Sequence, residues 1–323
     1  MGRGKTSLLL GVTGFIGTHL APYLAEKGEV VVGTYLRLSK GTRRDSKIRL
    51  VECDATRKSD IERVVRRFSP DYVYYLAGQS SVREAWFDPV KTIQINFLGG
   101  VHLLETVRQW SAKTRVLIFS SGTTYGLSHL GGRSLREGSC LTPKDPYSLS
   151  KMSLDLFGRF YAKVYGLEVF VVRLANIVGP GQSSTFSISN FAYQIAGIEA
   201  GLLPERIEVG NLLAKRDYLD IRDCVRALYL VMMRGESGEA YNIASGKSRN
   251  LRGIIAELIG LSKLRHDKIK IVKKRSLMSK DEIPSIRLNP SKFRRLTGWK
   301  PEIPFRQTLV DVLNDWRRKW NET

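Results

Sequence analysis

The sequence predicts an α/β fold built on a doubly wound parallel sheet, with a smaller C-terminal domain interleaved with it. Short apolar runs alternate with helical patterns over the first 175 residues, which is typical of a parallel sheet with helices on both faces. Three glycines, Gly11, Gly14 and Gly17, directly follow the first run. The alternation breaks at residues 179–189, which are rich in glycine and serine. This break indicates the start of a second region.

The expected elements follow from these runs in chain order. Strands are expected at residues 7–10, 29–35, 48–52, 72–77, 116–120 and 169–174. Helical patterns separate them, first after Gly17 and then at residues 59–68, 101–110 and 148–164. Beyond the break we expect a helix at 191–203, then a helix at 222–233 and a strand at 240–243 that return to the sheet.

Composition excludes several protein classes. The chain has 52 Lys+Arg against 31 Asp+Glu and a formal net charge of +21, which favours anionic partners. No apolar run reaches the roughly 18 residues that a spanning helix needs, so a soluble protein with no membrane partner is expected. Cys53, Cys140 and Cys224 form neither a disulfide framework nor a zinc motif, which suits a reducing, cytoplasmic location. The four scattered histidines support no metal site.

The glycine-rich turn is the first candidate binding site. Its GxxGxxG spacing lies between an expected strand and helix, where glycines let the backbone approach a pyrophosphate at the positive helix N-terminus. The pattern predicts a Rossmann-type fold, although a glycine-rich turn without a ligand is the alternative. Residues 1–175 and about 215–246 are therefore expected to form a dinucleotide-binding domain, and about 176–214 with 247–323 a substrate domain.

Basic residues follow the second expected strand, where a carboxylate would normally hold the ribose 2′-hydroxyl of NAD. Arg37, Lys40, Arg43 and Arg44 suit a 2′-phosphate instead. NADP(H) is therefore the expected cofactor, with NAD(H) as the second choice and a solvated basic loop as the alternative to both. Asp54, after the third strand, is expected either to accept from the adenine amino group or to cap the next helix.

Tyr147 and Lys151 share one face of an expected helix. The Lys151 ammonium is expected to lower the pKa of Tyr147, which would make the phenol a usable acid at neutral pH. A cluster of hydroxyl side chains at residues 120–125, with Ser121 among them, ends the fifth strand. Because open α/β sheets bind ligands at the carboxyl ends of their strands, these side chains are predicted to form one site.

Together these motifs resemble the extended short-chain dehydrogenase/reductase family. The glycine turn, Ser121 four residues before Tyr125, and Tyr147 with Lys151 carry the resemblance. It runs from about residue 8 to 316 and is greatest to the nucleotide-sugar branch. Segments similar to that branch are residues 76–82, 96–99, 179–182, 216–223, 241–242 and 298–301. Residues 179–182, 191–195 and 209–212 resemble the reductases of GDP-4-keto-6-deoxy-D-mannose, whose near relatives are the GDP-mannose 4,6-dehydratases.

The resemblance implies roles for individual residues. Ser121, Tyr147 and Lys151 would be catalytic. Cofactor contacts are implied for Gly11, Thr13, Gly14, Phe15, Ile16, Gly17, Arg37, Asp54, Ala55, Leu76, Ala77 and Gly78, together with Tyr147 and Lys151. Substrate contacts are implied for Gln79, Ser80, Ser81, Thr123, Asn176, Asn190, Asn211, Arg216, Arg275 and Glu282.

Some of these roles have structural alternatives. Arg216 would bind the substrate diphosphate, although a surface ion-pair network with the neighbouring aspartates is the alternative. Gln79, Ser80 and Ser81 are alternatively loop side chains that satisfy the backbone. An arginine that the relatives carry shortly before Glu282 is Ser279 here, with Arg275 nearby.

The implied chemistry is hydride transfer between nicotinamide and a sugar carbon, with Tyr147 exchanging the proton of that carbon's oxygen. The related dehydratases carry a glutamate where this chain has Thr123. The relatives that epimerise C3 and C5 carry a cysteine there, and a histidine at the position of Gly181. The favoured prediction is NADPH-dependent reduction of a 4-keto-6-deoxy nucleotide sugar, GDP-4-keto-6-deoxy-D-mannose to GDP-6-deoxy-D-mannose (GDP-rhamnose). A nucleotide-sugar 4,6-dehydratase or 4-epimerase is the alternative.

A non-catalytic RNA-binding relative is the alternative from another class. Residues 263–300 carry 13 Lys+Arg against three Asp+Glu, and such a run suits a nucleic-acid surface. The intact Ser, Tyr and Lys set argues against nucleic acid as the partner, since a binding module does not need it. A homodimer is expected, with the helices at 101–110 and 148–164 as the paired-helix face that the resemblance implies.

Overall fold

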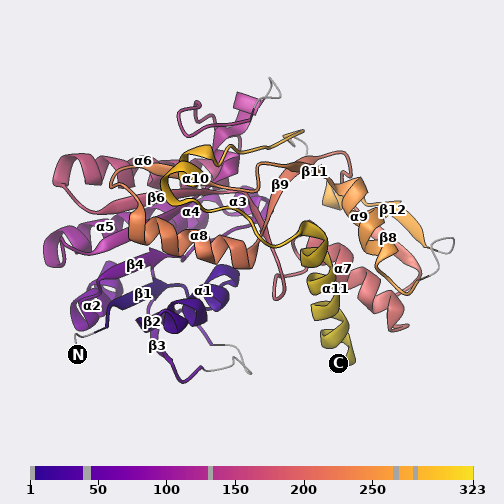
Figure 1. Ribbon diagram of the computed structural model, residues 1–323, viewed down its shortest axis with the longest axis horizontal. Helices are drawn as coiled ribbons and strands as arrows, with labels where there is room; N and C mark the ends of the chain where they lie inside the picture. The colour runs from indigo at the N-terminus through magenta and orange to yellow at the C-terminus, as the bar shows by residue number, and fades with distance from the viewer. Residues whose placement is uncertain (1–3, 39–44, 130–133, 265–268, 279–282, 323) are drawn as a thin grey trace.

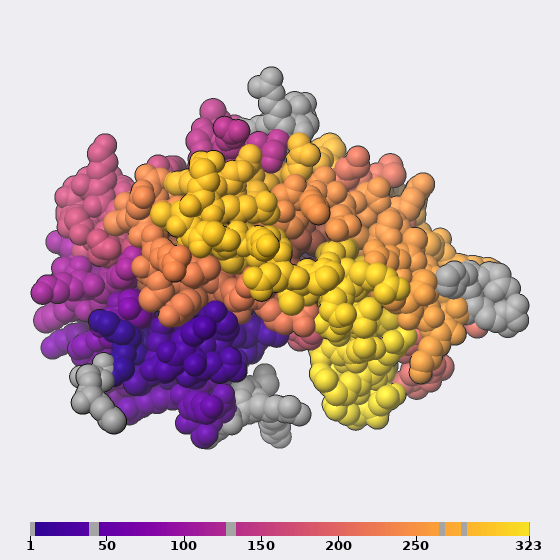
Figure 2. Space-filling model, viewed as in Figure 1, coloured from indigo at the N-terminus to yellow at the C-terminus, as the bar shows by residue number. Residues whose placement is uncertain are grey.

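The computed structural model describes residues 4–38, 45–129, 134–264, 269–278 and 283–322. Figure 1 shows a large body, in which helices cover a central sheet, beside a smaller and mostly helical body. In the space-filling view a notch separates the indigo N-terminal segment from the yellow C-terminal helix (Figure 2). The two bodies meet along segments that are far apart in the sequence.

A seven-stranded sheet forms the centre of the large body, and all its strands run parallel. The strand order is β10-β6-β5-β4-β1-β2-β3. The order reverses between β1 and β4, which is where open α/β sheets bind ligands. The predicted doubly wound sheet is thereby confirmed. The strands are β1 (Thr6–Leu10), β2 (Val30–Tyr35), β3 (Ile48–Glu52), β4 (Tyr72–Tyr75), β5 (Arg115–Ser121), β6 (Val169–Leu174) and β10 (Ala240–Ile243).

Helices cover both faces of this sheet. Strand β1 sends Leu9 into the core of one face and Leu8 and Leu10 into the core of the other, because successive strand side chains point to opposite sides. The Leu9 face is covered by α1 (Phe15–Glu26), α8 (Ile221–Arg234) and α10 (Ser291–Thr297). The opposite face is covered by α2 (Lys58–Phe68), α5 (Gly99–Trp110) and α6 (Pro146–Tyr165).

Short elements connect these layers. Between β4 and α5 lie α3 (Val82–Phe87), α4 (Pro89–Ile93) and the π-helical turn η1 (Gln94–Leu98). A distorted 3₁₀ segment, η2 (Gly122–His129), follows β5 directly, and Gly126 within it has a φ of 47°. A β-carbon at Gly126 would lie only 1.5 Å from the Thr142 carbonyl oxygen. Only glycine therefore fits this bend beside the carboxyl end of β5.

The smaller body has its own apolar core, to which α7, α9, α11 and β8 contribute. Its helices are α7 (Ser187–Glu199), α9 (Leu251–Gly260) and α11 (Phe305–Asn321), and a 3₁₀ turn, η3 (Arg275–Leu277), follows its last strand. Strands β8 (Arg206–Val209) and β12 (Lys270–Lys273) pair in parallel. A three-stranded sheet is formed by β7 (Asn176–Val178), β9 (Lys215–Asp220) and β11 (Ser248–Asn250).

The chain passes between the two bodies more than once, because α8 and β10 rejoin the large sheet after β9. Two contacts link α1 and α11 to the connecting turn. His19 Nε2 lies 2.9 Å from the Pro180 carbonyl oxygen, and the Gly181 N–H donates to Asp315 Oδ2 at 2.9 Å. The division into a dinucleotide-binding domain and a substrate domain at residues 175, 215 and 246 stays a prediction.

The expected helix at 191–203 differs from the structure, where α7 runs from Ser187 to Glu199. The serine-rich stretch before residue 191 has no strong apolar pattern and was predicted only to break the alternation of strands and helices. Ile188 is 2% exposed and packs into the core of the smaller body with Phe191. This tertiary burial draws the serines into the first turn, and Gly201, at a φ of 71°, follows the C-terminal end.

The described ranges contain no helix that is long and apolar enough to cross a membrane. Among the same residues, no group of three or more His, Cys, Asp or Glu side chains could hold a metal ion.

A buried polar network joins α6, β6, η2 and β10. Arg173 on β6 is 1% exposed, and its guanidinium donates to both carboxylate oxygens of the fully buried Asp155 at 2.7 and 3.1 Å. It also donates to Tyr125 Oη at 3.1 Å and to the Glu137 carbonyl oxygen at 2.8 Å. Tyr125 Oη in turn donates to Asn242 Oδ1 at 2.8 Å. The charge of Arg173 is therefore compensated by that of Asp155.

Asp155→Asn is expected to destabilise the protein by about 3 kcal/mol or more, because it leaves a buried guanidinium without its counter-charge. Glu62→Gln is the control, because the Lys58–Glu62 pair at 3.4 Å has side chains 46% and 30% exposed. Removing an exposed pair of this kind changes stability by about 0.5 kcal/mol at most. Urea unfolding at pH 7 measures both variants. An Asp155→Asn protein as stable as the Glu62→Gln protein would contradict the role given to the buried pair.

Candidate active site

The predicted catalytic side chains meet at the carboxyl edge of the large sheet. Ser121 is the last residue of β5, and it pairs in register with Leu174 at the end of β6. Tyr147 lies in the first turn of α6 and Lys151 one turn later. Asp145 caps this helix by accepting from the Ser148 N–H at 2.8 Å. This cap and the proline at the first helical position fix where α6 begins, and so where Tyr147 lies.

The Ser121 hydroxyl lies close enough to the Tyr147 phenol to act on its pKa. Burial raises the pKa of Tyr147 to about 12, against which the Ser121 hydroxyl acts in the opposite direction. The expectation that Lys151 lowers the pKa of Tyr147 is wrong for this structure. Burial in a low-dielectric site favours the neutral phenol, and the phenol is therefore protonated at neutral pH, as a proton donor must be.

Lys151 is only 8% exposed, and burial lowers the pKa of its ammonium from 10.5 to about 8. No carboxylate is among the causes of this shift. A β-carbon built at Gly78 would lie 3.3 Å from Lys151 Nζ and 3.1 Å from Asn96 Oδ1. The ammonium thus lies beside the end of β4 and a buried amide. Below about pH 8, Lys151 is charged in more than half of the protein molecules.

Asn96 is a residue of this site that was not among the predicted contacts. Its side chain is fully buried in the π-helical turn η1. Its amide nitrogen donates to Ser150 Oγ and to the Gln79 carbonyl oxygen, both at 3.0 Å, and its oxygen accepts from the Gln79 N–H at 2.8 Å. An asparagine inside an apolar helical pattern is the sequence signal for such a role. The π-turn that aims it inward has no comparable signal.

The glycine turn has the geometry of a phosphate cradle. Gly11 has a φ of 90°, and a β-carbon there would lie 2.9 Å from Ala77. A β-carbon at Gly17 would lie 2.4 Å from the Val12 carbonyl oxygen. The turn therefore packs tightly against β4 and against the helix that follows it. Gly14 caps α1 without any side-chain hydrogen bond, and the first turn of α1 has no acidic residue, so its N–H groups suit a pyrophosphate.

The other residues predicted to contact the cofactor surround this turn. Thr13 is exposed, whereas Phe15, Ile16 and Leu76 are partly buried against the core of the α1 face. Ala55 and Ala77 pack against the core of the opposite face. The set lies at the carboxyl ends of β1, β3 and β4. These residues therefore fit a dinucleotide that lies across the point where the strand order reverses.

Arg37 lies two residues beyond β2 and is exposed to solvent. The other three basic residues of the predicted 2′-phosphate site, at positions 40, 43 and 44, lie outside the described residues. Asp54 accepts from the backbone N–H and the hydroxyl of Thr56 at 2.9 and 2.7 Å. Its carboxylate therefore closes the turn before α2. The alternative that Asp54 caps this helix is wrong, because the N-cap of α2 is Arg57 and no side-chain hydrogen bond caps it.

The three polar residues after β4 make mainly local contacts. Gln79 donates to the Ser81 carbonyl oxygen at 2.8 Å, and Ser81 caps α3 by accepting from the Glu84 N–H at 3.2 Å. Ser80 is exposed. Two of the three polar side chains thus satisfy backbone groups of their own loop.

Thr123 lies beside Ser121, to whose oxygen both its N–H and its hydroxyl donate, at 3.2 and 2.9 Å. Asn176 is exposed on β7, two residues after Leu174. Arg216, partly buried on β9, donates to the Lys215 carbonyl oxygen at 2.9 Å. The first two flank the carboxyl edge that holds Ser121.

The remaining predicted substrate residues lie in the smaller body. Asn190 on α7 donates to the Ser184 carbonyl oxygen at 2.9 Å. Asn211 accepts from the Leu213 N–H at 3.0 Å. Arg275 is exposed, and its turn lies against Gly210, because a β-carbon at Gly210 would lie 2.4 Å from the Leu277 carbonyl oxygen. The structure thus brings Asn211 close to the Arg275 turn. Glu282 lies outside the described residues.

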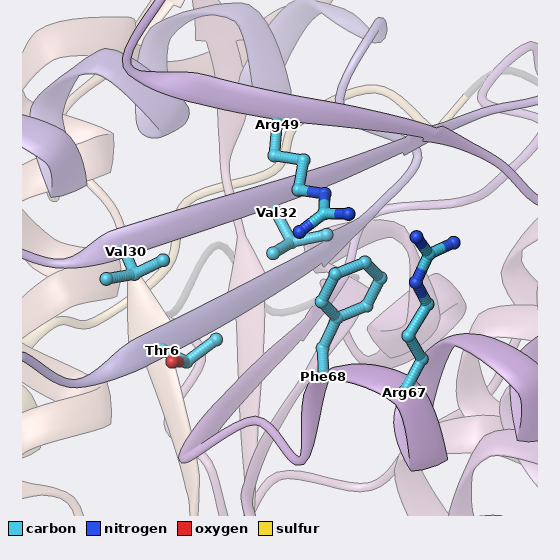
Figure 3. Close-up of a pocket in the computed structure, with 6 residues that line it drawn as sticks. All are labelled: Thr6, Val30, Val32, Arg49, Arg67 and Phe68. Carbon is cyan, nitrogen blue, oxygen red and sulfur yellow. The ribbon is translucent and has the colours of Figure 1, made fainter. Parts of the chain in front are cut away.

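Two hollows in the surface lie away from the catalytic candidates Ser121, Tyr147 and Lys151. One, of about 220 Å³, is lined by residues that include Thr6 and Val30 at the amino ends of β1 and β2. Figure 3 shows Arg49 and Arg67 on either side of the Phe68 ring in this pocket. The other, of about 250 Å³, lies between α1 and α8. Neither includes Ser121, Tyr147 or Lys151, so the candidate active site rests on the convergence of side chains.

Lys151→Met is expected to raise the free energy of unfolding of the cofactor-free protein by about 3 kcal/mol at pH 7. A folded pKa of about 8 against 10.5 in the unfolded chain means that burying the charged form costs about 1.4 kcal/mol per pKa unit. The stability gained by Lys151→Met is full below pH 8, where Lys151 is protonated in both the folded and the unfolded chain. It shrinks between pH 8 and 10.5, where the folded lysine is already neutral, and it is lost above that.

Urea unfolding at pH 7 and pH 10 measures this effect, and Lys163→Met is the control. Lys163 is an exposed lysine on the same helix, and its replacement is expected to change stability by less than about 0.5 kcal/mol. Equal stabilities of the two variants at pH 7 would contradict the buried, charged state of Lys151.

Comparison with known proteins matches this arrangement to one family. The model of the family described as GDP-mannose 4,6 dehydratase matches residues 8–312. The GDP-6-deoxy-D-mannose reductase of Pseudomonas aeruginosa is 33% identical over 312 residues, which is 97% of each chain. The GDP-mannose 4,6-dehydratase of Yersinia enterocolitica is 28% identical, over 96% of this chain and 93% of its own.

Solved structures agree with these matches. The structure of RMD from Pseudomonas aeruginosa complexed with NADPH has a TM-score of 0.84 at 30% identity, covering 98% of this chain and 99% of its own. UDP-glucose 4-epimerase from Thermotoga maritima, solved with UDP-glucose, has a TM-score of 0.87 at 25% identity, covering 97% and 99%. The relatives are sugar-nucleotide reductases, dehydratases and epimerases that use NAD(P). The chain therefore belongs to the GDP-mannose 4,6-dehydratase family of nucleotide-sugar enzymes.

Proposed function

We propose that this protein uses NADPH to reduce the C4 keto group of GDP-4-keto-6-deoxy-D-mannose, giving GDP-6-deoxy-D-mannose. The observation that carries the proposal is the meeting of Ser121, Tyr147 and Lys151 at the carboxyl edge, with a threonine in the neighbouring position 123. The 33% identity to a GDP-6-deoxy-D-mannose reductase supports the choice of substrate.

In this proposal Tyr147 donates the proton that the carbonyl oxygen acquires. When bound, NADPH supplies the hydride to the sugar carbon. Burial keeps Tyr147 protonated at neutral pH, and Ser121 donates a second hydrogen bond to the same carbonyl oxygen. Lys151, charged below about pH 8 and one turn along α6, is not among the groups that act on the Tyr147 pKa in the unbound site. In this proposal its charge offsets the phenolate only once proton donation has formed it.

In the described part of the chain, the acidic side chains considered for a dehydration are exposed or bound to other groups. Glu84 is exposed on α3, and the Glu137 carboxylate accepts from the Asn242 N–H at 2.9 Å in the buried network. Asp145 acts on Tyr147 electrostatically, but its carboxylate caps α6. Loss of a hydroxyl group needs a tuned acid and a base, and the Thr123 hydroxyl is too weakly acidic to replace a carboxyl group. This arrangement supports reduction over dehydration.

We assign the cofactor to the turn at Gly11–Gly17 and the strand ends around it, and the substrate to the groups between the two bodies. Arg37 is exposed just beyond β2, and in this proposal it binds the 2′-phosphate, which favours NADPH. In the smaller body, Asn211 and the Arg275 turn would hold the nucleotide, and Arg216 the diphosphate. The large body with α8 and β10 would then be the cofactor domain.

A homodimer is part of the proposal. Helix α6 exposes a row of apolar side chains, among which Phe160 is 51% and Val164 54% exposed. Leu98, 41% exposed, lies just before α5, and Phe97 packs edge-on against Phe157 of α6. An apolar face of this kind across two adjacent helices suits burial against a second copy.

The function is tested with NADPH and 4-keto-6-deoxy sugars linked to GDP, dTDP, UDP and CDP, following the absorbance of the reduced nicotinamide. We expect oxidation to be fastest with the GDP-linked sugar. Tyr147→Phe should lower kcat by about 10² to 10⁴ with little change in NADPH affinity, whereas Tyr165→Phe, at the exposed end of α6, should not.

The contradicting results come from the same assay. Full turnover by the Tyr147→Phe protein would remove the proton donor from the proposal. GDP-mannose supplied with catalytic NADP⁺ should stay intact, and its sustained conversion to a product lighter by one water would favour the dehydratase alternative.

Arg37→Ala is expected to weaken NADPH binding about 10- to 100-fold, because a charge-assisted hydrogen bond to phosphate contributes about 1.5–3 kcal/mol. NADH binding should change little, since NADH lacks the 2′-phosphate. Fluorescence titration measures both affinities. Arg66→Ala is the control. Arg66 lies on α2, and its guanidinium carbon is 4.2 Å from the centroid of the Trp110 ring, so it is an arginine outside the predicted cofactor site. An unmodified protein that binds both cofactors equally well would refute the preference.

A further inference from the structure

We propose that Thr123 is a positioning residue that fixes the direction in which Ser121 donates its hydrogen bond. The inference rests on the proposed reduction and adds a residue that acts through Ser121. Thr123 lies in η2, two residues after the end of β5. Its side chain is partly buried next to the Ser121 hydroxyl.

The hydrogen-bond accounting of Ser121 leads to this inference. A serine hydroxyl has one hydrogen to donate and two lone pairs to accept with. The Thr123 N–H donates to Ser121 Oγ at 3.2 Å, and the Thr123 hydroxyl donates to the same oxygen at 2.9 Å. Both lone pairs are thereby occupied. The single hydrogen of Ser121 has to point away from Thr123. On the other side the Ser121 hydroxyl acts on the Tyr147 phenol, whose pKa it lowers against the effect of burial.

This direction matters for proton donation. A carbonyl oxygen in the site would accept from Ser121 and from Tyr147, and its demand for both hydrogen bonds grows as negative charge develops on it. If Ser121 were free to rotate, its oxygen could instead accept from the Tyr147 hydroxyl. The proton of Tyr147 would then be held by the protein rather than aimed at the substrate. Because Thr123 already occupies both lone pairs of the Ser121 oxygen, Ser121 cannot accept from Tyr147 before the substrate binds.

Thr124 provides a matched comparison within the same segment. Its hydroxyl donates to the backbone carbonyl oxygen of Ser121 at 2.6 Å, and its side chain is fully buried. It therefore contacts the same residue without touching the Ser121 hydroxyl. Replacing either threonine by valine keeps the size and β-branching of the side chain and removes one hydroxyl group.

The kinetic test compares Thr123→Val, Thr123→Ser and Thr124→Val with the unmodified enzyme in NADPH-dependent reduction of GDP-4-keto-6-deoxy-D-mannose. Thr123→Val should lower kcat about 10- to 100-fold with KM changed less than about threefold. Thr123→Ser restores the donor and should bring kcat back to within about threefold of the unmodified enzyme. Thr124→Val should lower the melting temperature while keeping kcat. A Thr123→Val enzyme that raises KM alone would make Thr123 a substrate contact and overturn the inference.

A second readout needs no turnover. In crystal structures with NADP⁺, Ser121 should keep one rotamer, directed at Tyr147, in the unmodified protein and in Thr123→Ser. In Thr123→Val it should adopt a second rotamer or accept from Tyr147. An unchanged Ser121 in Thr123→Val would overturn the inference whatever the substrate is. Absence of reduction by the unmodified enzyme would count against the proposed function alone.

Discussion

The Arg173 guanidinium depends on Asp155, because an unpaired charge in the interior of the large body would cost several kcal/mol. Asp155 lies one helical turn beyond Lys151 on α6, and Arg173 lies next to Leu174, the partner in register with Ser121. The ion pair at 2.7 Å therefore ties the helix of Tyr147 and Lys151 to the strand beside Ser121. The relative positions of all three catalytic candidates depend on that contact, and Tyr125 and Asn242 extend it to η2 and β10.

The site itself works against stability. Lys151 is buried without a carboxylate, which lowers the pKa of its ammonium to about 8. The raised pKa of Tyr147 adds no cost at neutral pH, because the phenol is uncharged in both the folded and the unfolded chain. An unbound protein bears the cost of burying Lys151, whereas a phenolate formed during proton donation would turn the same ammonium into a favourable partner. Such strain is common in active sites. The buried ion pair of Arg173 with Asp155, which lies one turn beyond Lys151 on α6, stabilises the helix against the cost of burying Lys151.

Much of the fold was predictable from local pattern, because parallel strands buried on both faces are continuous apolar runs. The strands of the large sheet lie within two residues of their expected positions, and the spacing of Tyr147 and Lys151 placed both on one face of α6. Helix α7 was misplaced because tertiary burial of Ile188 decides its start. Asn96 lies in a segment that resembled the nucleotide-sugar branch, but it was not among the predicted contacts, because the π-turn that turns it inward has no sequence signal. The pKa of Tyr147 was misjudged because spacing does not reveal burial, which raises this pKa, and because Lys151 is not among the groups that act on it.

The direct test of net carbonyl reduction is isotope transfer from NADPH that carries deuterium at the transferable C4 position. After incubation with GDP-4-keto-6-deoxy-D-mannose, mass spectrometry and NMR of the product should show one deuterium on C4 of the sugar, with one equivalent of NADP⁺ formed. An enzyme that dehydrates or epimerises the sugar regenerates its cofactor within each turnover. A product formed without consumption of NADPH, or without deuterium at C4, would contradict the account.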